Sequence, residues 1–300
     1  MSKPIGFKAL AERIAQEKGY AAIIPVLEKE LLHYEVLAAL DKARFLDSLV
    51  FQGGTSLRLC YGSERFSEDL DFAGGSGFDG GQMSGIKEVL ESEIASRYDV
   101  EVHVKEPSRR VLEQKGIAQS SVQVDCWQIQ VVTSQGRPDI PQQRIKLEVA
   151  SVPAHTRSVR ALLVNYEELP YGYSNILVPV EEPEEIAADK LLALAVSAHT
   201  RYRDIWDLRW LAARPQFARE RLSGLLRKKV EDYHVAEGFQ QVIAYFLPKL
   251  PGLVNSDEFL NLMRRFLPAT TVQQTLGREL FRQHLAETLE ELYIDALDPE

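Results

Sequence analysis

The chain has 300 residues, a length typical of about two domains or of one large domain with an appendage. Hydrophobic residues make up 45% and charged residues 26%, which is the composition of a soluble globular protein whose core needs no disulfide staples. The net charge of −9 argues against a generally basic, nucleic-acid-coating surface but leaves room for local basic patches.

The amino-terminal part begins with helices and reaches a glycine turn. Residues 6–47 have helical periodicity, and a second helix is expected over Val36–Phe45. A short apolar run at 49–51 predicts a strand that ends at Gly53-Gly54. A helix is expected to start immediately afterwards, with Thr55 or Ser56 as its N-cap.

Strands dominate the next hundred residues. Asp69–Phe72 reads as a strand that precedes a glycine-rich loop, and 84–96 reads as a helix. Five further strands are predicted over 99–105, 121–133, 144–149, 161–164 and 176–180, with a turn at 135–141.

Strand patterns stop at Pro183, which suits the first turn of a helix. Helices are expected over 183–199, 204–213 and 219–234, and then to Leu297. The basic runs at 109–110, 219–229 and 264–265 are interpreted as solvated helix faces. The layout predicts an α+β fold with a helical lead and α/β domain over 1–180 and an all-helical domain over 181–300.

The cysteines and the N-terminus favour a cytoplasmic protein. Cys60 and Cys126 lie in apolar stretches and are expected to be buried free thiols, and no Cys/His cluster indicates zinc. The first residues lack the apolar core of a signal peptide. No run of about 18 apolar residues predicts a membrane span.

Gly53-Gly54-Thr55-Ser56 is a candidate phosphate-binding motif. Glycines between a strand and a helix let the backbone approach a ligand, and the helix N-terminus offers free N–H groups. Triphosphate oxygens would fit there. Taken alone, the motif is better explained as a plain structural glycine turn, and no Walker A lysine follows it.

Asp69 and Asp71 form a candidate metal site. Residues two apart on a strand point to the same face, so their carboxylates are expected side by side. Two such charges are unfavourable without a cation, and Mg²⁺, or Mn²⁺ in its place, prefers oxygen ligands. Paired carboxylates that hold metal ions are a recurring device of in-line phosphoryl chemistry.

A third carboxylate would complete this site. Glu148 is the first candidate, because Ile145, Leu147 and Val149 alternate with it and would form the buried face of the strand. A cross-strand salt bridge is the structural alternative for Glu148. Asp125 is the second candidate for the third ligand.

Two later elements carry charges that suit phosphate. Lys190 lies in an apolar helix, where it either neutralises phosphate or extends to solvent. Asp204 and Asp207 are three residues apart and share a helix face. Arg203 and Asp204 form either a structural ion pair or a nucleotide contact.

Taken together, these motifs resemble the AbiEii/AbiGii toxins. The resemblance covers roughly 45–210. It consists of a strand ending in Gly-Gly, then Ser-Glu-Asp-Leu-Asp-Phe, a lysine helix, and Arg-Asp-Ile-Trp-Asp-Leu. It implies a polymerase-β-like nucleotidyltransferase fold, a mixed sheet with flanking helices followed by a helical C-terminal part.

The resemblance also implies roles for residues. Asp69, Asp71, Lys190 and Asp207 would be catalytic, with Asp69, Asp71 and Glu148 as metal ligands. The nucleotide would contact a further set of side chains and backbone groups: Gly53, Gly54, Thr55, Ser56, Arg58, Ser67, Arg203 and Asp204. Glu148 stands where an Asp is more usual in the superfamily, and Thr55 separates the glycines from Ser56.

Members of this family are toxins of bacterial toxin–antitoxin systems, so an NTP substrate and a cognate antitoxin are implied. Some members, the MenT toxins, transfer nucleotides to the 3′ end of tRNA and block aminoacylation. The expected function is therefore nucleotide transfer to tRNA. The alternatives are nucleotidyl or phosphoryl transfer to a protein hydroxyl, or an inactive nucleotide-binding module.

Overall fold

The computed structural model describes residues 6–98, 100–111, 122–133 and 142–298. The turn predicted at 135–141 lies outside the described residues, as do the first residues of the strands predicted at 99–105 and 121–133.

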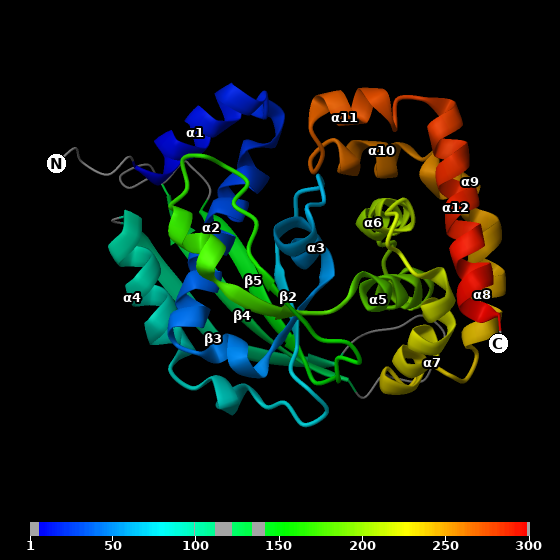
Figure 1. Ribbon diagram of the computed structural model, residues 1–300, viewed down its shortest axis with the longest axis horizontal. Coiled ribbons are helices and arrows are strands. Elements are labelled where there is room, and N and C mark those ends of the chain that lie inside the picture. The colour runs from blue at the N-terminus through cyan, green and yellow to red at the C-terminus, as the bar shows by residue number, and fades with distance from the viewer. Residues whose placement is uncertain (1–5, 99, 112–121, 134–141, 299–300) are drawn as a thin grey trace.

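A seven-stranded mixed sheet forms the centre of the amino-terminal part (Figure 1). The strand order is β3-β4-β5-β2-β1-β7-β6. β1 pairs with β7 and β2 pairs with β5 in parallel, and the other four neighbours are antiparallel. The strands are β1 (Val50–Gln52), β2 (Leu70–Ala73), β3 (Glu101–Val111), β4 (Gln123–Val132), β5 (Gln143–Ala150), β6 (Ser158–Ala161) and β7 (Leu177–Val180).

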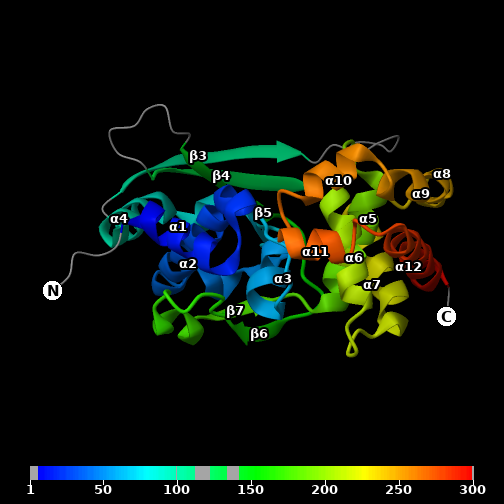
Figure 2. The same cartoon turned by 90° about the horizontal axis from the view of Figure 1, so that it is seen from above.

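Three helices, α1 (Phe7–Lys18), α2 (Ile24–Lys42) and α4 (Ile86–Tyr98), lie on the same side of β3 and β4 (Figure 2). The side chains that alternate toward them are apolar: Ile145, Leu147 and Val149 of β5 are fully buried, as predicted. The prediction of a separate helix over 36–45 was wrong. α2 runs unbroken through Val36, because almost every residue on its second half is buried by the sheet or a neighbouring helix.

The chain from Pro183 onward is helical, as predicted. Its helices are α5 (Pro183–Val196), α6 (Tyr202–Ala212), α7 (Leu222–Asp232), α8 (Phe239–Phe246), α9 (Leu250–Val254), α10 (Asp257–Met263), α11 (Ala269–Gln274) and α12 (Glu279–Leu297). Short 3₁₀ turns lie at Ala21–Ile23, Phe45–Ser48, Gly80–Met83, Tyr171–Asn175, Arg219–Arg221 and Leu247–Lys249. Within the described ranges, no helix is both long and apolar enough to cross a membrane.

Two expectations about charged and thiol residues need correction. Lys229 is not solvated but fully buried, and Arg109 and Arg110 lie on strand β3 rather than on a helix. Cys60 is buried as predicted, whereas Cys126 is only half-buried because it faces the open side of the sheet; both are free thiols.

Helix α3 (Gly53–Tyr61) starts two residues earlier than predicted. Its N-cap is Gln52, and no side chain caps it. Thr55 and Ser56 therefore lie inside the first turn, where the Ser56 hydroxyl donates to the Gly53 carbonyl at 2.8 Å. The Thr55 hydroxyl donates to the Asp69 carbonyl, which ties the start of α3 to the start of β2.

Candidate functional site

A cavity of about 190 Å³ lies between the sheet and helix α5. The sheet side contributes Gln52 of β1, Asp71 of β2 and Glu148 of β5, and Gly53 at the start of α3 lies beside them. The helical part contributes Lys190, Arg201 and Asp204, together with Asp189, whose carboxylate pairs with Lys229. Ser197, apolar residues of α5 and Tyr233 complete the wall. The cavity therefore brings together residues from the two halves of the chain.

The sheet side of the cavity is anionic. Asp71 and Glu148 are register partners on the adjacent parallel strands β2 and β5, so their side chains lie next to each other on the same face. Burial, followed by the negative charges of Glu148 and Asp69, raises the pKa of Asp71 to about 7. The nearby cations of Arg201 and Lys190 offset this rise only in part.

Asp69 lies immediately before β2, beside the cavity rather than in its lining. Its carboxylate accepts from the Lys146 backbone N–H at 3.3 Å. The side chain of Asp125 points to the opposite face of the sheet, because Asp125 pairs with Val149 in the register next to Glu148. There it accepts from Arg109 at 2.9 Å and from the Gly80 N–H.

Close neighbours leave no room for a side chain at either glycine of the motif. Gly53 has φ +76°, and a Cβ there would lie 2.7 Å from Asp71 Oδ2. A Cβ on Gly54 would lie 2.2 Å from the Arg65 guanidinium and 3.0 Å from the Ser67 hydroxyl. The start of α3 thus approaches the anionic wall on one side and a buried arginine on the other.

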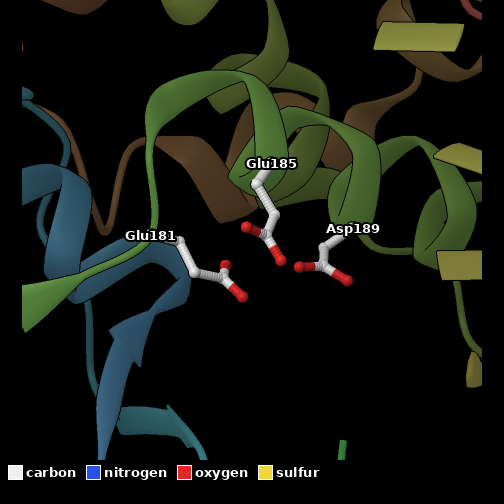
Figure 3. Close-up of side chains that lie close together, drawn as sticks. All are labelled: Glu181, Glu185 and Asp189. Carbon is white, nitrogen blue, oxygen red and sulfur yellow. The ribbon is translucent and has the colours of Figure 1, made fainter. Parts of the chain in front are cut away.

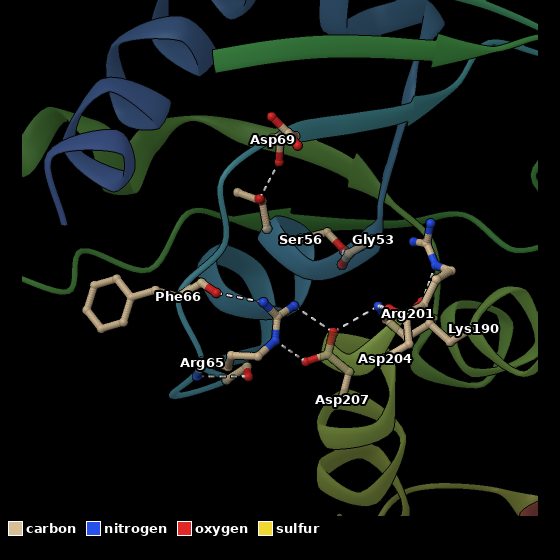
Figure 4. Close-up of polar contacts among 11 residues, drawn as sticks. Gly53, Ser56, Arg65, Phe66, Asp69, Lys190, Arg201, Asp204 and Asp207 are labelled. Carbon is tan, nitrogen blue, oxygen red and sulfur yellow. Dashed lines mark hydrogen bonds and ion pairs between the residues drawn. The ribbon is translucent and has the colours of Figure 1, made fainter. Parts of the chain in front are cut away.

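The helical side of the cavity is cationic (Figure 4). Lys190 Nζ lies 2.6 Å from Asp204 Oδ1 and 2.8 Å from Asp207 Oδ2. Arg65 donates two hydrogen bonds to Asp207, of 2.6 and 2.7 Å, and Arg201 donates one to Asp204 at 2.5 Å. Burial opposes ionisation of both aspartates, but these cations hold the pKa of Asp204 and that of Asp207 below the usual range.

This cationic cluster consists of Lys190, Arg65, Arg201, Asp204 and Asp207. Three cations against two carboxylates leave one net positive charge, and Asp71 and Glu148 face it across the cavity. A cavity with one anionic and one cationic wall fits a polyanion on the cationic side and a metal cation on the other.

The remaining candidate residues lie outside the cavity lining. Arg58 is buried in an ion pair with Glu30 at 2.8 Å, and Arg203 pairs with Glu68 at 3.3 Å. The guanidinium of Arg203 also lies over the Phe266 ring at 5.1 Å. Asp207 is fully buried behind Lys190. Thr55, Ser56 and Ser67 are buried around the start of α3.

Sequence reasoning missed Arg65 and Arg201 as site residues. Arg65 lies two residues before Ser67, in a segment with no periodic pattern that would have predicted its burial. Arg201 precedes α6 and stands three residues before Asp204, a spacing that predicts an ion pair on a helix and was available in the sequence.

A second buried cluster lies next to the first, at Glu181, Glu185 and Asp189 (Figure 3). One oxygen from each carboxylate lies within 4.8 Å of the others, a geometry that suits a metal ion. The Lys229 ammonium already holds the cation position, at 3.1, 2.7 and 2.8 Å from the three residues. Burial raises the pKa of Glu181 and that of Asp189, and Lys229 counters it in part.

The fit of a divalent metal is better at Asp71 and Glu148 than at this second cluster. Their carboxylates, with that of Asp69, are hard oxygen donors, and burial together with their mutual repulsion raises the pKa of Asp71. Glu148 is drawn toward Arg110 and Asp69 toward the Lys146 N–H, so the three do not converge as closely as the second cluster does. Arg110 pairs with Glu148, but no ammonium lies among all three carboxylates as Lys229 does in the second cluster, and the hard oxygen donors fit Mg²⁺ or Mn²⁺.

One solved structure shares the fold of this chain, and two further structures show a weaker likeness. MenT4, a nucleotidyltransferase toxin from Mycobacterium tuberculosis H37Rv, has a TM-score of 0.54 at 18% identity, covering 97% of this chain and 99% of that one. JHP933 from Helicobacter pylori has a TM-score of 0.42 at 21% identity, covering 90% of each chain. A second Helicobacter pylori structure has a TM-score of 0.43 at 22% identity, covering 90% and 92%.

The sequence comparison identifies the family. No curated protein matches the chain. The family model described as the nucleotidyl transferase AbiEii toxin of a type IV toxin–antitoxin system matches residues 35–294, which include both walls of the cavity. The chain therefore belongs to the AbiEii nucleotidyltransferase toxin family.

Proposed function

We propose that this protein is a metal-dependent toxin that transfers a nucleotide from an NTP to an acceptor hydroxyl, with the tRNA 3′ end as the favoured acceptor. The observation that carries the proposal is the single cavity with an anionic wall at Asp71 and Glu148 and a cationic wall at Lys190 and Arg201. Transfer to tRNA would block translation. A cytoplasmic location and a cognate antitoxin follow from the same proposal.

The triphosphate would lie between the start of α3 and the cationic wall. The first N–H groups of a helix have no intrahelical acceptor, and those of α3 begin at Gly53 in the cavity lining. Arg201 lines the cavity with a half-exposed side chain, so part of its guanidinium is available to phosphate oxygens. Lys190 adds positive charge while Asp204 and Asp207 fix its position.

Asp69, Asp71 and Glu148 would hold Mg²⁺. When bound, such an ion lowers the pKa of a coordinated hydroxyl and neutralises phosphate charge. The acceptor oxygen forms a bond to the α-phosphorus, the bond to the β-phosphate oxygen breaks, and pyrophosphate leaves. The hydroxyl proton passes to a carboxylate oxygen of the anionic wall, and the leaving pyrophosphate stays beside Lys190 and Arg201.

Labelled NTPs, Mg²⁺ and total tRNA test the proposal directly. Label should appear on tRNA, disappear with a chelator, and return when excess Mg²⁺ is added. Asp71→Asn should abolish it, because the isosteric amide removes a charge without removing bulk. Asp41→Asn, the same change at an exposed acid of α2 outside the cavity, is the matched control and should keep full transfer.

Three results would contradict the proposal. Label on protein instead of tRNA would make a protein hydroxyl the acceptor. NTP binding without any transfer would make the chain a nucleotide-binding module. Full transfer by Asp71→Asn would remove the carboxylate-bound metal from the mechanism.

A further inference from the structure

The side of β3, β4 and β5 that faces away from α2 and α4 carries a polar groove of about 310 Å³. Strand alternation explains it, since apolar residues face the helices and the residues between them face out. The groove is lined by Lys105, Glu106, Ser108, Arg110, Cys126, Gln128, Lys146 and Glu148. In Figure 2 the labelled helices α1, α2 and α4 all lie on the other side of these strands.

The groove is a basic surface on an acidic protein. Its two acids each lie near a cation, Glu106 by Lys87 at 4.0 Å and Glu148 by Arg110 at 2.5 Å. Lys105 is exposed and has no ion-pair partner among the described residues. The cations therefore outnumber the acids here, although the whole chain carries a net charge of −9.

Arg144 extends the basic surface away from the cavity. Along β5, Arg144, Lys146 and Glu148 point to the same open face, at intervals of about 7 Å given the rise of a strand. Arg144 is opposite Gln130 on β4, just as Lys146 is opposite Gln128. The result is a line of exposed cations that ends at the carboxylates of the site.

The groove meets the nucleotide cavity at Glu148, which lines both. The Lys146 backbone, on the floor of the groove, also donates to Asp69. Along β5 the groove lies on the Lys146 side of Glu148 and the cavity on the Ala150 side, so a molecule in the groove would present its end to the anionic wall from the Lys146 side. Two substrates can therefore reach the carboxylates from two directions.

We infer that this groove binds the backbone of a single-stranded RNA end and delivers its terminal hydroxyl to Asp69, Asp71 and Glu148, an inference that rests on the proposed function. Cations and hydrogen-bond donors suit phosphate and sugar oxygens, whereas a polypeptide would need apolar pockets that this lining lacks. Among the described residues that line the groove, none is an aromatic on which bases could stack, so binding depends on charge more than on sequence.

The test reverses charge at the groove without touching either cavity wall. Lys105→Glu combined with Arg144→Glu should raise the KM for total tRNA about tenfold or more and leave the KM for NTP unchanged. Lys105→Arg combined with Arg144→Lys keeps the charges and should retain parent values. Arg227→Glu combined with Lys228→Glu changes the same charge on exposed residues of α7 and is the matched control.

Direct binding separates this inference from the proposed function. Fluorescence anisotropy with a short labelled single-stranded RNA, in the absence of NTP, requires no catalysis. The groove variant should bind more weakly, and its plot of log Kd against log salt should lose a slope of about 0.7 per phosphate contact. Equal RNA affinity in parent and groove variant overturns the groove inference even if transfer occurs. If the parent protein transfers no nucleotide but the groove variant binds RNA more weakly than the parent, the proposed function is overturned and the groove inference is supported.

Discussion

Two buried clusters around lysines differ in net charge although they begin at neighbouring residues of α5. Lys190 belongs to the cationic cluster at the cavity, and Asp189 belongs to the cluster around Lys229. The first has three cations and two carboxylates, whereas the second has one ammonium and three carboxylates. Adjacent helix residues point about 100° apart, so one turn of α5 serves both.

The difference shows what each cluster is suited to do. Excess positive charge at a cavity wall attracts a polyanion, and it keeps Asp204 and Asp207 ionised. In the second cluster, burial first and the neighbouring carboxylates second raise the pKa of Glu181 and that of Asp189, whereas Lys229 and hydrogen bonds hold the pKa of Glu185 below its usual value. We therefore expect the Lys190 cluster to control transfer and the Lys229 cluster to control stability.

Replacing Lys190 should have the largest effect on transfer. Lys190→Met removes the ammonium that faces the triphosphate, and kcat/KM should fall about 10²- to 10³-fold, as for the loss of one donor that stabilises transition-state charge. Arg65 and Arg201 still pair with both aspartates, so urea unfolding should change much less than transfer does. Retained transfer with a large loss of stability would reverse the roles assigned to the two clusters.

Replacing Lys229 should have the largest effect on stability. Lys229→Met leaves three buried carboxylates without a cation, and the free energy of unfolding should fall by about 3–5 kcal/mol. The exposed neighbour provides the control, because Lys228→Met should change unfolding by less than about 0.5 kcal/mol. Transfer per folded molecule should stay within a few-fold of the parent; a hundredfold loss would place this cluster in the chemistry.

A smaller effect is expected from Arg65→Lys. Lysine keeps the charge but loses the bidentate hydrogen bonds to Asp207 and the hydrogen bond to the Phe66 carbonyl. The free energy of unfolding should fall by about 1–3 kcal/mol. The NTP KM should rise severalfold, because Asp207 helps to position Lys190. Urea unfolding and steady-state kinetics measure the two effects, and an unchanged NTP KM would restrict Arg65 to a structural role.

The smallest effect, and the one that best separates the clusters, is the pH dependence of stability. Because the pKa of Asp204 is lower in the folded protein, its ionised carboxylate stabilises the fold at any pH above the ordinary aspartate pKa, about 4. This stabilisation is lost as the pH falls below about 4 toward the folded pKa. The raised pKa of Glu181 has the opposite sign, since stability falls as pH rises above about 4 toward the folded pKa.

Thermal unfolding from pH 2 to pH 8 measures this contrast. Asp204→Asn should cost more stability at pH 7 than at pH 2, because the contribution of the ionised carboxylate is lost below its ordinary pKa of about 4. Glu181→Gln should be harmful or neutral at pH 4 and become relatively more favourable at pH 8. Parallel pH profiles for the two variants would mean that the clusters do not differ in protonation.

Much of the fold followed from sequence patterns. Alternation on β5 predicted its buried face, and the loss of strand patterns at Pro183 predicted the helical C-terminal part. The boundaries of α2 and α3 were predicted less well. Burial of α2 on most sides removed the break expected near Val36, and Gly53 joined the helix although its φ is positive.

The sequence alone identified the family, because the glycine turn, the Asp69/Asp71 pair and the Lys190 helix occur in a specific order and spacing. Which of these residues share a cavity was decided only by the tertiary structure. It placed Asp125 and Glu148 on opposite faces, directed Arg203 to Glu68 and Phe266, and brought Arg65 to Asp207 across 142 positions. Local periodicity specifies the direction of a side chain relative to its own helix or strand, but long-range register and packing determine which partner lies in that direction.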